Sequence, residues 1–208
     1  MTAREVATPL GPARVHLTEP AAAVAGTLVL GHGAGGGVDS ADLIAVAGAA
    51  AGGGWRVLRV EQPWRVAGRR IAPAPPRLDE AWTAVLDVVR EDWLTGPLVL
   101  GGRSAGARVA CRTASAQGAA GVLTLAFPLH PPGRPEKSRA AELRGVDVPL
   151  LVVQGGTDAF GGPAEVAAAL AGHAGTVRAV PGDHALKKDP AAVAGAVVDW
   201  LGVTPWIR

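Results

Sequence analysis

Short apolar segments alternate with longer segments of mixed polarity along most of the chain. Six apolar segments are five to eight residues long, rich in Val or Leu and bordered by Gly or Pro, and they cover residues 26–31, 55–60, 97–102, 121–127, 148–155 and 176–180. Runs of this length and composition are typical of strands that are buried on both faces of a parallel sheet. The pattern therefore predicts a mostly parallel sheet of about six or seven main strands.

The segments between these strands show helical periodicity. It is clearest over residues 77–93, where Leu78, Trp82, Val85 and Val89 recur at intervals of three or four. Further on, Asp189 before Pro190 supplies an N-cap followed by a proline at the first helical position. Helices are also predicted over residues 104–116, 163–171 and 191–201, and from Asp39 or Ser40 to about residue 51.

The alternation of strands and helices predicts a three-layer α/β fold, in which helices cover both faces of the sheet. Within residues 1–20, a turn at Leu10-Gly11-Pro12 separates Val6 from Val15, so an antiparallel hairpin is expected at the sheet edge. Residues 65–77 and 129–139 are rich in Pro and Gly and are expected to be loops. No linker is long enough to divide the chain, so residues 1–208 are expected to form one domain.

The composition excludes several classes of protein. Hydrophobic residues make up 49% of the 208 residues and charged residues 18%, which is too apolar for a disordered chain. The net charge is only +2 and no dense basic stretch occurs, so a nucleic-acid partner is not expected. No apolar run reaches the roughly 18 residues of a membrane span, and the N-terminus lacks a signal pattern, so we expect a cytoplasmic protein without a membrane partner. The single cysteine, Cys111, excludes an internal disulfide and a multi-cysteine metal site.

The strongest chemical signal is the G-x-S-x-G pattern at residues 102–106, centred on Ser104. A predicted strand precedes it and a predicted helix follows it, which is the context in which two glycines allow a sharp turn and present the serine hydroxyl above a sheet. The alternative is a glycine-rich turn that carries a solvated serine. We interpret Ser104 as a nucleophile.

A glycine-rich segment, residues 32–37, follows the first parallel strand. A loop at this place supplies a backbone N–H to an oxyanion, and the expected pair of donors is the amides of Ala34 and Ala105. A phosphate loop is the competing interpretation, but the segment lacks the G-K-[ST] ending and the G-x-G-x-x-G register. His32 is expected to hold the loop in place rather than to act as an acid or base.

A serine nucleophile needs a base, and the base needs an acid to orient it. His184 lies in a loop after the last strand, at the carboxyl edge of the sheet, where open α/β sheets carry their sites. Asp158 follows the fifth parallel strand and reaches the same edge. Asp183 competes for the role of the acid, but a residue adjacent to His184 rarely folds back onto its own imidazole.

In order along the chain, the candidates are Ser104, Asp158 and His184, and with this order the sequence resembles the α/β-hydrolase superfamily. The closer resemblance is to a small lidless branch, described as dienelactone-hydrolase-like or as the hydrolase-like domain of a nuclear acetyltransferase-complex subunit. The matching segments lie within about residues 26–202, and the most distinctive is Pro-rich; they are residues 32–37 (HGAGGG), 101–108 (GGRSAGAR), 127–137 (FPLHPPGRPEK), 154–161 (QGGTDAFG) and 182–186 (GDHAL).

The resemblance implies an α/β-hydrolase fold without a cap, a catalytic triad of Ser104, Asp158 and His184, and an oxyanion site at Ala34 and Ala105. Two departures stand out. Ala105 and Ala107 replace the Met and Gly expected in close relatives, and dienelactone hydrolase proper has a Cys where this chain has Ser104. The substrate of that enzyme therefore does not carry over.

We expect a serine hydrolase, carboxylesterase-like, that cleaves a small or exposed ester, or a related acyl or lactone bond, through an acyl-enzyme. Residues 129–148, where a lid is usually inserted, are few, so the site should be open. Its substrate-binding residues are expected to be Gly33, Gly35, His130 and Phe160. The expected partner is a small-molecule acyl substrate, with no metal or organic cofactor, and the oligomeric state is left open.

Two alternatives keep the same fold. One is a non-catalytic protein-interaction module, and the other is an acyltransferase that uses an acceptor other than water. Arg103 and Arg108 flank the predicted turn, either as structural ion pairs or as cations that bind an acidic substrate.

Overall fold

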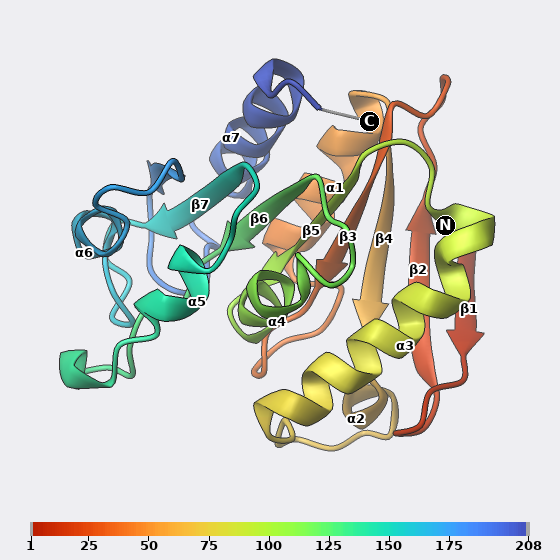
Figure 1. Ribbon diagram of the computed structural model, residues 1–208, viewed down its shortest axis with the longest axis horizontal. Coiled ribbons are helices and arrows are strands. Elements are labelled where there is room, and N and C mark those ends of the chain that lie inside the picture. The colour runs from red at the N-terminus through yellow and green to blue at the C-terminus, as the bar shows by residue number, and fades with distance from the viewer. Residues whose placement is uncertain (1, 207–208) are drawn as a thin grey trace.

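The computed structural model describes residues 2–206, which form one eight-stranded sheet with helices on both faces (Figure 1). The strand order is β1-β2-β4-β3-β5-β6-β7-β8. Neighbouring strands from β4 to β8 are parallel, while β1 pairs with β2, and β2 with β4, in antiparallel fashion. The three-layer, mostly parallel α/β architecture predicted from the sequence is confirmed.

Every predicted parallel strand is present. They are β3 (Gly26–Gly31), β4 (Trp55–Glu61), β5 (Leu98–Arg103), β6 (Gly121–Leu125), β7 (Leu150–Gly155) and β8 (Thr176–Val180). The predicted hairpin is β1 (Thr2–Val6) and β2 (Ala13–Thr18). The sheet has eight strands rather than six or seven because β2 pairs along β4, so the hairpin extends the main sheet.

The predicted helices are α1 (Ala41–Gly52), α3 (Pro75–Trp93), α4 (Ala105–Thr113), α6 (Pro163–Ala169) and α7 (Pro190–Val203). At the start of α7 the Asp189 side chain accepts a hydrogen bond from the Ala192 amide at 2.9 Å, which confirms the predicted cap. Three short elements were not predicted: α2 (Pro63–Val66), which runs into the expected loop 65–77, η1 (Pro135–Lys137), which lies within the expected loop 129–139, and α5 (Ala140–Arg144), which directly follows it. Each is too short to produce a periodic pattern in the sequence.

Alternation of side chains along the strands divides the core into two layers. Leu28 and Leu30 of β3 face α1 and α7, whereas Val29 between them faces the layer that contains α3 and α4 (Figure 1). A strand that is buried on both faces must be apolar at every position, as β3 is. Because six strands run in parallel, their carboxyl ends meet at one edge of the sheet, where the candidate residues gather.

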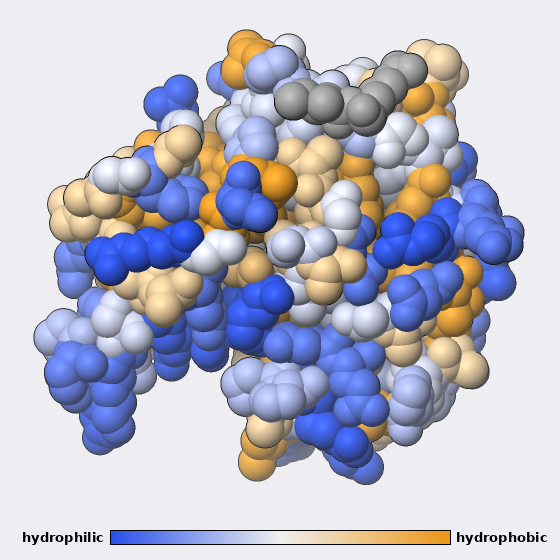
Figure 2. Space-filling model, viewed as in Figure 1, coloured by the Kyte–Doolittle hydropathy of each residue, from blue (hydrophilic) through white to orange (hydrophobic). Residues whose placement is uncertain are grey.

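Large apolar side chains that remain exposed are spread over different elements of residues 2–206. Ile44, Ile71, Val88 and Val203 belong to α1, the α2–α3 loop, α3 and α7 respectively. On the face drawn in Figure 2, apolar and polar residues are interspersed. This face therefore presents no single large apolar surface.

Candidate active site

Ser104 occupies a strained turn between β5 and α4. Its backbone has φ 52° and ψ −106°, a conformation that residues other than glycine adopt rarely. The turn is held by the Ser104 amide, which donates to the carbonyl oxygen of Leu125 on the neighbouring strand at 2.9 Å. In this turn the Ser104 hydroxyl is within hydrogen-bond distance of His184.

The two glycines of the G-x-S-x-G pattern are required by close backbone packing. A Cβ on Gly102 would lie 2.5 Å from the carbonyl oxygen of Gly31, and one on Gly106 would lie 2.5 Å from the Gly31 carbonyl carbon. Real Cβ atoms essentially never approach so closely. The end of β3 can therefore lie against the end of β5 and the first turn of α4 only because Gly102 and Gly106 carry no side chain.

The structure brings together the three side chains that the sequence singled out, although they lie far apart along the chain. The Nε2 atom of His184 is 2.9 Å from Ser104 Oγ, and its Nδ1 atom is 2.8 Å from Asp158 Oδ2. With Asp158 as an acceptor, Nδ1 carries the proton and Nε2 is free to accept one from the serine hydroxyl. This is the relation between nucleophile, base and orienting acid that acyl transfer requires.

Asp158 is fixed by more than its contact with His184. Its side chain is fully buried, Oδ1 accepts a hydrogen bond from the Phe160 amide at 2.8 Å, and Oδ2 accepts one from Gln154 Nε2 at 2.9 Å. Gln154 is itself fully buried at the end of β7. The sequence analysis did not identify Gln154 as a functional residue. Its amide follows four apolar residues of a buried strand, a pattern which indicates that the amide is hydrogen-bonded to another buried polar group.

Phe160 packs directly on the imidazole of His184. The two ring centroids are 4.2 Å apart and the planes are inclined by 32°. Phe160 therefore covers one face of the ring that contacts Ser104. Its predicted contact with a substrate remains a prediction.

The glycine-rich segment lies against the serine. A Cβ on Gly33 would be 3.4 Å from Ser104 Cβ, and Ala34 and Gly35 are exposed at the surface. Ala105 is the first residue of α4, so its amide has no partner inside the helix. These positions are compatible with the predicted oxyanion donors, whose role stays a prediction.

His32 holds this segment in place. Its Nδ1 atom donates to the Gly33 carbonyl oxygen at 2.9 Å, and its Nε2 atom accepts from the Gln62 amide at 3.1 Å. Burial is the main reason why the pKa of His32 lies below its usual value, so the ring is neutral at pH 7. The His32 carbonyl oxygen also accepts from the Gly106 amide at 3.1 Å, which joins the segment to α4.

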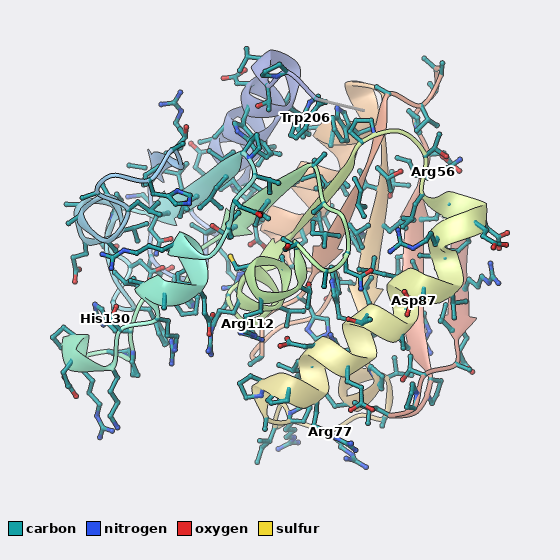
Figure 3. The ribbon with its side chains drawn as sticks, in the orientation of Figure 1. Arg56, Arg77, Asp87, Arg112, His130 and Trp206 are labelled. Carbon is teal, nitrogen blue, oxygen red and sulfur yellow. The ribbon has the colours of Figure 1, made fainter. Side chains whose placement is uncertain are left out.

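His130 lies in the segment between β6 and α5 (Figure 3), and both of its ring nitrogens are engaged. Nδ1 is 3.0 Å from the Pro131 carbonyl oxygen, and Nε2 is 3.0 Å from Glu165 Oε2. These two acceptors, Pro131 first, raise the pKa of His130 above its usual value. Its amide donates to the Phe160 carbonyl oxygen at 3.0 Å, so it supports the Phe160 loop, and its predicted substrate contact stays a prediction.

Arg103 and Arg108 both form ion pairs. Arg108 binds Glu142 through two hydrogen bonds of 2.9 and 2.6 Å, and Arg103 Nε lies 3.1 Å from Asp42 Oδ2. Arg112, further along α4 (Figure 3), also contacts Glu142, at 3.2 Å. Of the two interpretations of these arginines, the structure favours the ion pairs.

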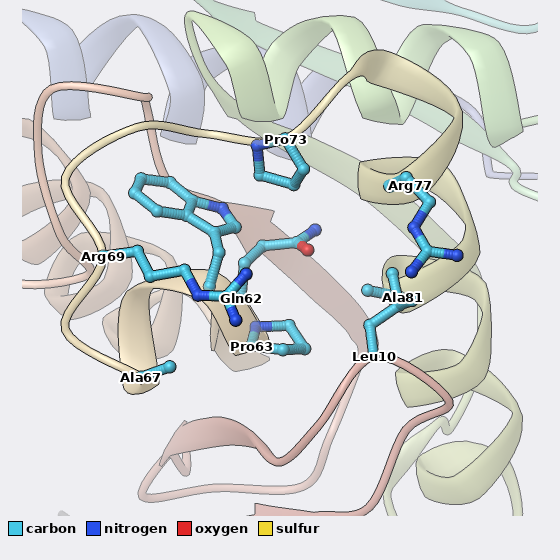
Figure 4. Close-up of a pocket in the computed structure, with 9 residues that line it drawn as sticks. Leu10, Gln62, Pro63, Ala67, Arg69, Pro73, Arg77 and Ala81 are labelled. Atoms are coloured by element: carbon cyan, nitrogen blue, oxygen red, sulfur yellow. The ribbon is translucent and has the colours of Figure 1, made fainter.

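A cavity that sequence analysis did not predict opens beside α2 (Figure 4). Its volume is about 100 Å³, and it includes Arg69 and Arg77 in a wall otherwise formed by Leu10, Gln62, Pro63, Trp64, Ala67, Pro73 and Ala81. Gln62 and Trp64 also line a narrower space against Ala105 and Gly106. Because the two spaces share Gln62 and Trp64, the cavity adjoins the space beside the start of α4.

Cys111 is buried in α4, and burial raises the pKa of its thiol far above the usual value. We expect this thiol to be unreactive toward a disulfide reagent such as Ellman's reagent at pH 8 in the native protein. It should react fully once the chain is unfolded in guanidinium chloride. The absorbance of the released thiolate measures both, and rapid reaction of the native protein would contradict the buried position.

Among residues 2–206, no three His, Cys, Asp or Glu side chains gather closely enough to hold a metal ion. Within the same part of the chain, no helix is both long and apolar enough to cross a membrane.

The fold agrees with comparisons to known proteins. The family model described as "Alpha/beta hydrolase domain" matches residues 24–194, so the chain belongs to the α/β-hydrolase family. A search of curated proteins finds no significant match.

Several solved structures share the fold over nearly their full length. An α/β serine hydrolase homologue from Coxiella burnetii is 20% identical with a TM-score of 0.78, covering 98% of this chain and 97% of the other. A serine hydrolase without a lid from Xanthomonas campestris is 24% identical with a TM-score of 0.76, covering 98% and 96%. Est1E from Butyrivibrio proteoclasticus is 15% identical with a TM-score of 0.80, covering 96% and 97%. The lidless form of the family expected from the sequence is thereby confirmed.

Proposed function

We propose that the protein is a serine hydrolase that cleaves esters, or related acyl or lactone bonds, of a small-molecule substrate through an acyl-enzyme. The observation that carries this proposal is the hydrogen-bonded series from Ser104 Oγ through His184 to the buried Asp158 carboxylate. The strained turn at Ser104 adds support, because a backbone outlier of this kind persists only where the surrounding structure imposes it.

In the proposed reaction, Ser104 Oγ attacks the carbonyl carbon of the ester while His184 Nε2 takes the hydroxyl proton. Asp158 holds the imidazole by its Nδ1 proton and stabilises the cation that forms. The amides of Ala34 and Ala105 bind the oxyanion, and loss of one such donor typically lowers the rate by about 10²–10³. His184 then protonates the departing alcohol, and a water molecule, deprotonated by the same nitrogen, releases the acid and restores Ser104.

A site without a lid over Ser104 favours substrates with small or exposed acyl groups. The segment between β6 and β7, where a lid would be inserted, contains only η1 and α5. Est1E has been solved with ferulic acid bound, and it shares the fold at 14% identity. Ferulate esters therefore belong in a substrate panel beside short acyl esters, although the fold alone does not select between them.

A fluorophosphonate probe tests the nucleophile directly. We expect one molecule of probe to attach to Ser104 in the wild type and none to attach to the Ser104→Ala variant. Ser115, an exposed serine just beyond α4, provides the matched control, and Ser115→Ala should be labelled like the wild type. Intact mass and peptide mapping identify the labelled residue.

The same variants are then assayed against 4-nitrophenyl acetate, butyrate and octanoate and against methyl ferulate. Turnover by the wild type that Ser104→Ala lacks supports the proposal. If the wild type and Ser104→Ala are labelled and turn over alike, the enzyme hypothesis is wrong and the non-catalytic interaction module becomes the better explanation. Activity that rises only with long acyl chains would contradict the open site.

A further inference from the structure

Arg103, the residue before Ser104, places one guanidinium against three separate parts of the candidate site. Its Nη2 donates to the backbone carbonyl oxygen of His184 at 2.9 Å. Its Nη1 lies against the glycine-rich segment, because a Cβ on Gly33 would be 2.9 Å from it. Its Nε is 3.1 Å from the Asp42 carboxylate of α1. The side chain thus contacts both the loop of the proposed base and the loop of a proposed oxyanion donor.

Asp42 supplies the charge that holds this guanidinium. The Asp42 side chain is only 1% exposed. Within residues 2–206, Asp42 forms its ion pair with Arg103. Neither carboxylate oxygen accepts a well-aligned hydrogen bond from this part of the chain. A buried carboxylate without a counter-charge is strongly unfavourable, so Asp42 favours the presence of the cation at this place.

We propose that Arg103, held by Asp42, is a positioning residue that sets the His184 loop and the glycine-rich segment relative to Ser104. The inference rests on the proposed function, because a positioning role requires that Ser104 and His184 carry out the reaction. It assigns no chemistry to Arg103 itself. Arg103 holds the main chain of His184 by a hydrogen bond, and it packs against Gly33. Loss of the arginine side chain therefore displaces the base and the oxyanion donor together. A misplacement of about 1 Å in an active site lowers the rate by about 10²-fold.

An arginine is needed here because its planar fork directs several N–H groups in different directions. A lysine retains the charge, but its ammonium is a compact point charge on a flexible stem and cannot reproduce this set of contacts. Arg103→Lys therefore keeps a cation near Asp42 while it removes the link between the two loops. Arg108→Lys is the matched control, because it also weakens a partly buried ion pair of an arginine near the same turn, but Arg108 contacts Glu142 of α5 instead.

The experiment measures kcat and KM of these variants with the best ester of the panel, together with the labelling rate of Ser104 and the melting temperature. For Arg103→Lys we expect kcat and the labelling rate to fall by about 10- to 100-fold, with KM changed by less than about twofold. For Arg108→Lys we expect kcat within about twofold of the wild type. If Arg103→Lys does not fold, a second variant, Asp42→Asn with Arg103→Gln, takes its place. It removes both charges, so no buried charge is left unpaired. It should show the same loss of kcat.

The inference is overturned if the folded Arg103 variants keep kcat within about twofold of the wild type. It is also overturned if Arg108→Lys loses as much kcat as Arg103→Lys, or if the loss equals the fraction of unfolded protein, since either result indicates a purely structural role. An active wild type with undiminished Arg103 variants refutes this inference alone. A wild type that neither hydrolyses an ester nor is labelled at Ser104 refutes the proposed function and this inference with it.

Discussion

Replacing Asp158 by Asn is expected to lower kcat for an ester by about 10⁴, with the fold retained. Asp158 Oδ2 accepts hydrogen bonds from His184 Nδ1 and from Gln154 Nε2. Oδ1 accepts from the Phe160 amide, so the single amide nitrogen of an asparagine would face a donor at either position, and the neutral amide would no longer stabilise the imidazolium that forms. Where the nitrogen takes the place of Oδ2, the imidazole has to turn its Nδ1 lone pair toward the asparagine. The proton would then sit on Nε2, where it prevents His184 from accepting the proton of Ser104.

Asp183→Asn is the control for this prediction. Asp183 is the neighbouring carboxylate in the His184 loop, it is exposed, and its Oδ1 accepts from the Ala185 amide at 2.9 Å, which an asparagine oxygen can also do. We expect its kcat to stay within about twofold of the wild type. Steady-state assays of both variants, with circular dichroism to verify folding, separate the two carboxylates. Equal losses for both, or a loss for Asp183→Asn alone, would remove Asp158 from its proposed role.

The positions of the three main candidates were predictable because each follows a predicted parallel strand. Ser104, Asp158 and His184 come after β5, β7 and β8, and the carboxyl ends of parallel strands share one edge. The hydrophobic pattern locates buried strands well, since both of their faces must be apolar. Nothing in a linear pattern gives the distance between the ends of β5 and β8, so the convergence itself had to come from the structure.

Residues that act by contact across the fold were not predictable in the same way. Gln154 supports Asp158, and Arg103 reaches the main chain of His184, 81 residues further along the chain. The Arg103 contact depends on the relative placement of separate elements, on which periodicity has no bearing. Gln154 and Asp158 are only four residues apart, and their contact depends on the conformation of the loop that follows β7. The cavity beside α2 was missed for a related reason: its wall combines residues of the expected loop 65–77 with Leu10, with residues 62–64 and with Ala81, and only the fold brings these segments together.

Gly106→Ala is expected to destabilise the protein by roughly 2–4 kcal/mol, although alanine is the better helix former. The added methyl would overlap the main-chain carbonyl of Gly31, at the end of a central strand. A backbone carbonyl cannot rotate away as a side chain can, so α4 would have to shift outward and take Ser104 with it. For a domain of about 200 residues, this corresponds to a melting temperature lower by roughly 5–15 °C.

A glycine-to-alanine substitution in α1 should have the opposite effect on stability. Gly48 lies within α1, and a Cβ there would have no neighbour within 4 Å. Gly48→Ala should therefore stabilise the protein by about 0.5–1 kcal/mol, the usual advantage of alanine over glycine in a helix. Thermal unfolding of the two variants measures the difference, and kcat should fall in the Gly106 variant alone. Equal melting temperatures would show that β3 and α4 are not in the contact described, and the turn that presents Ser104 would then lack its proposed basis.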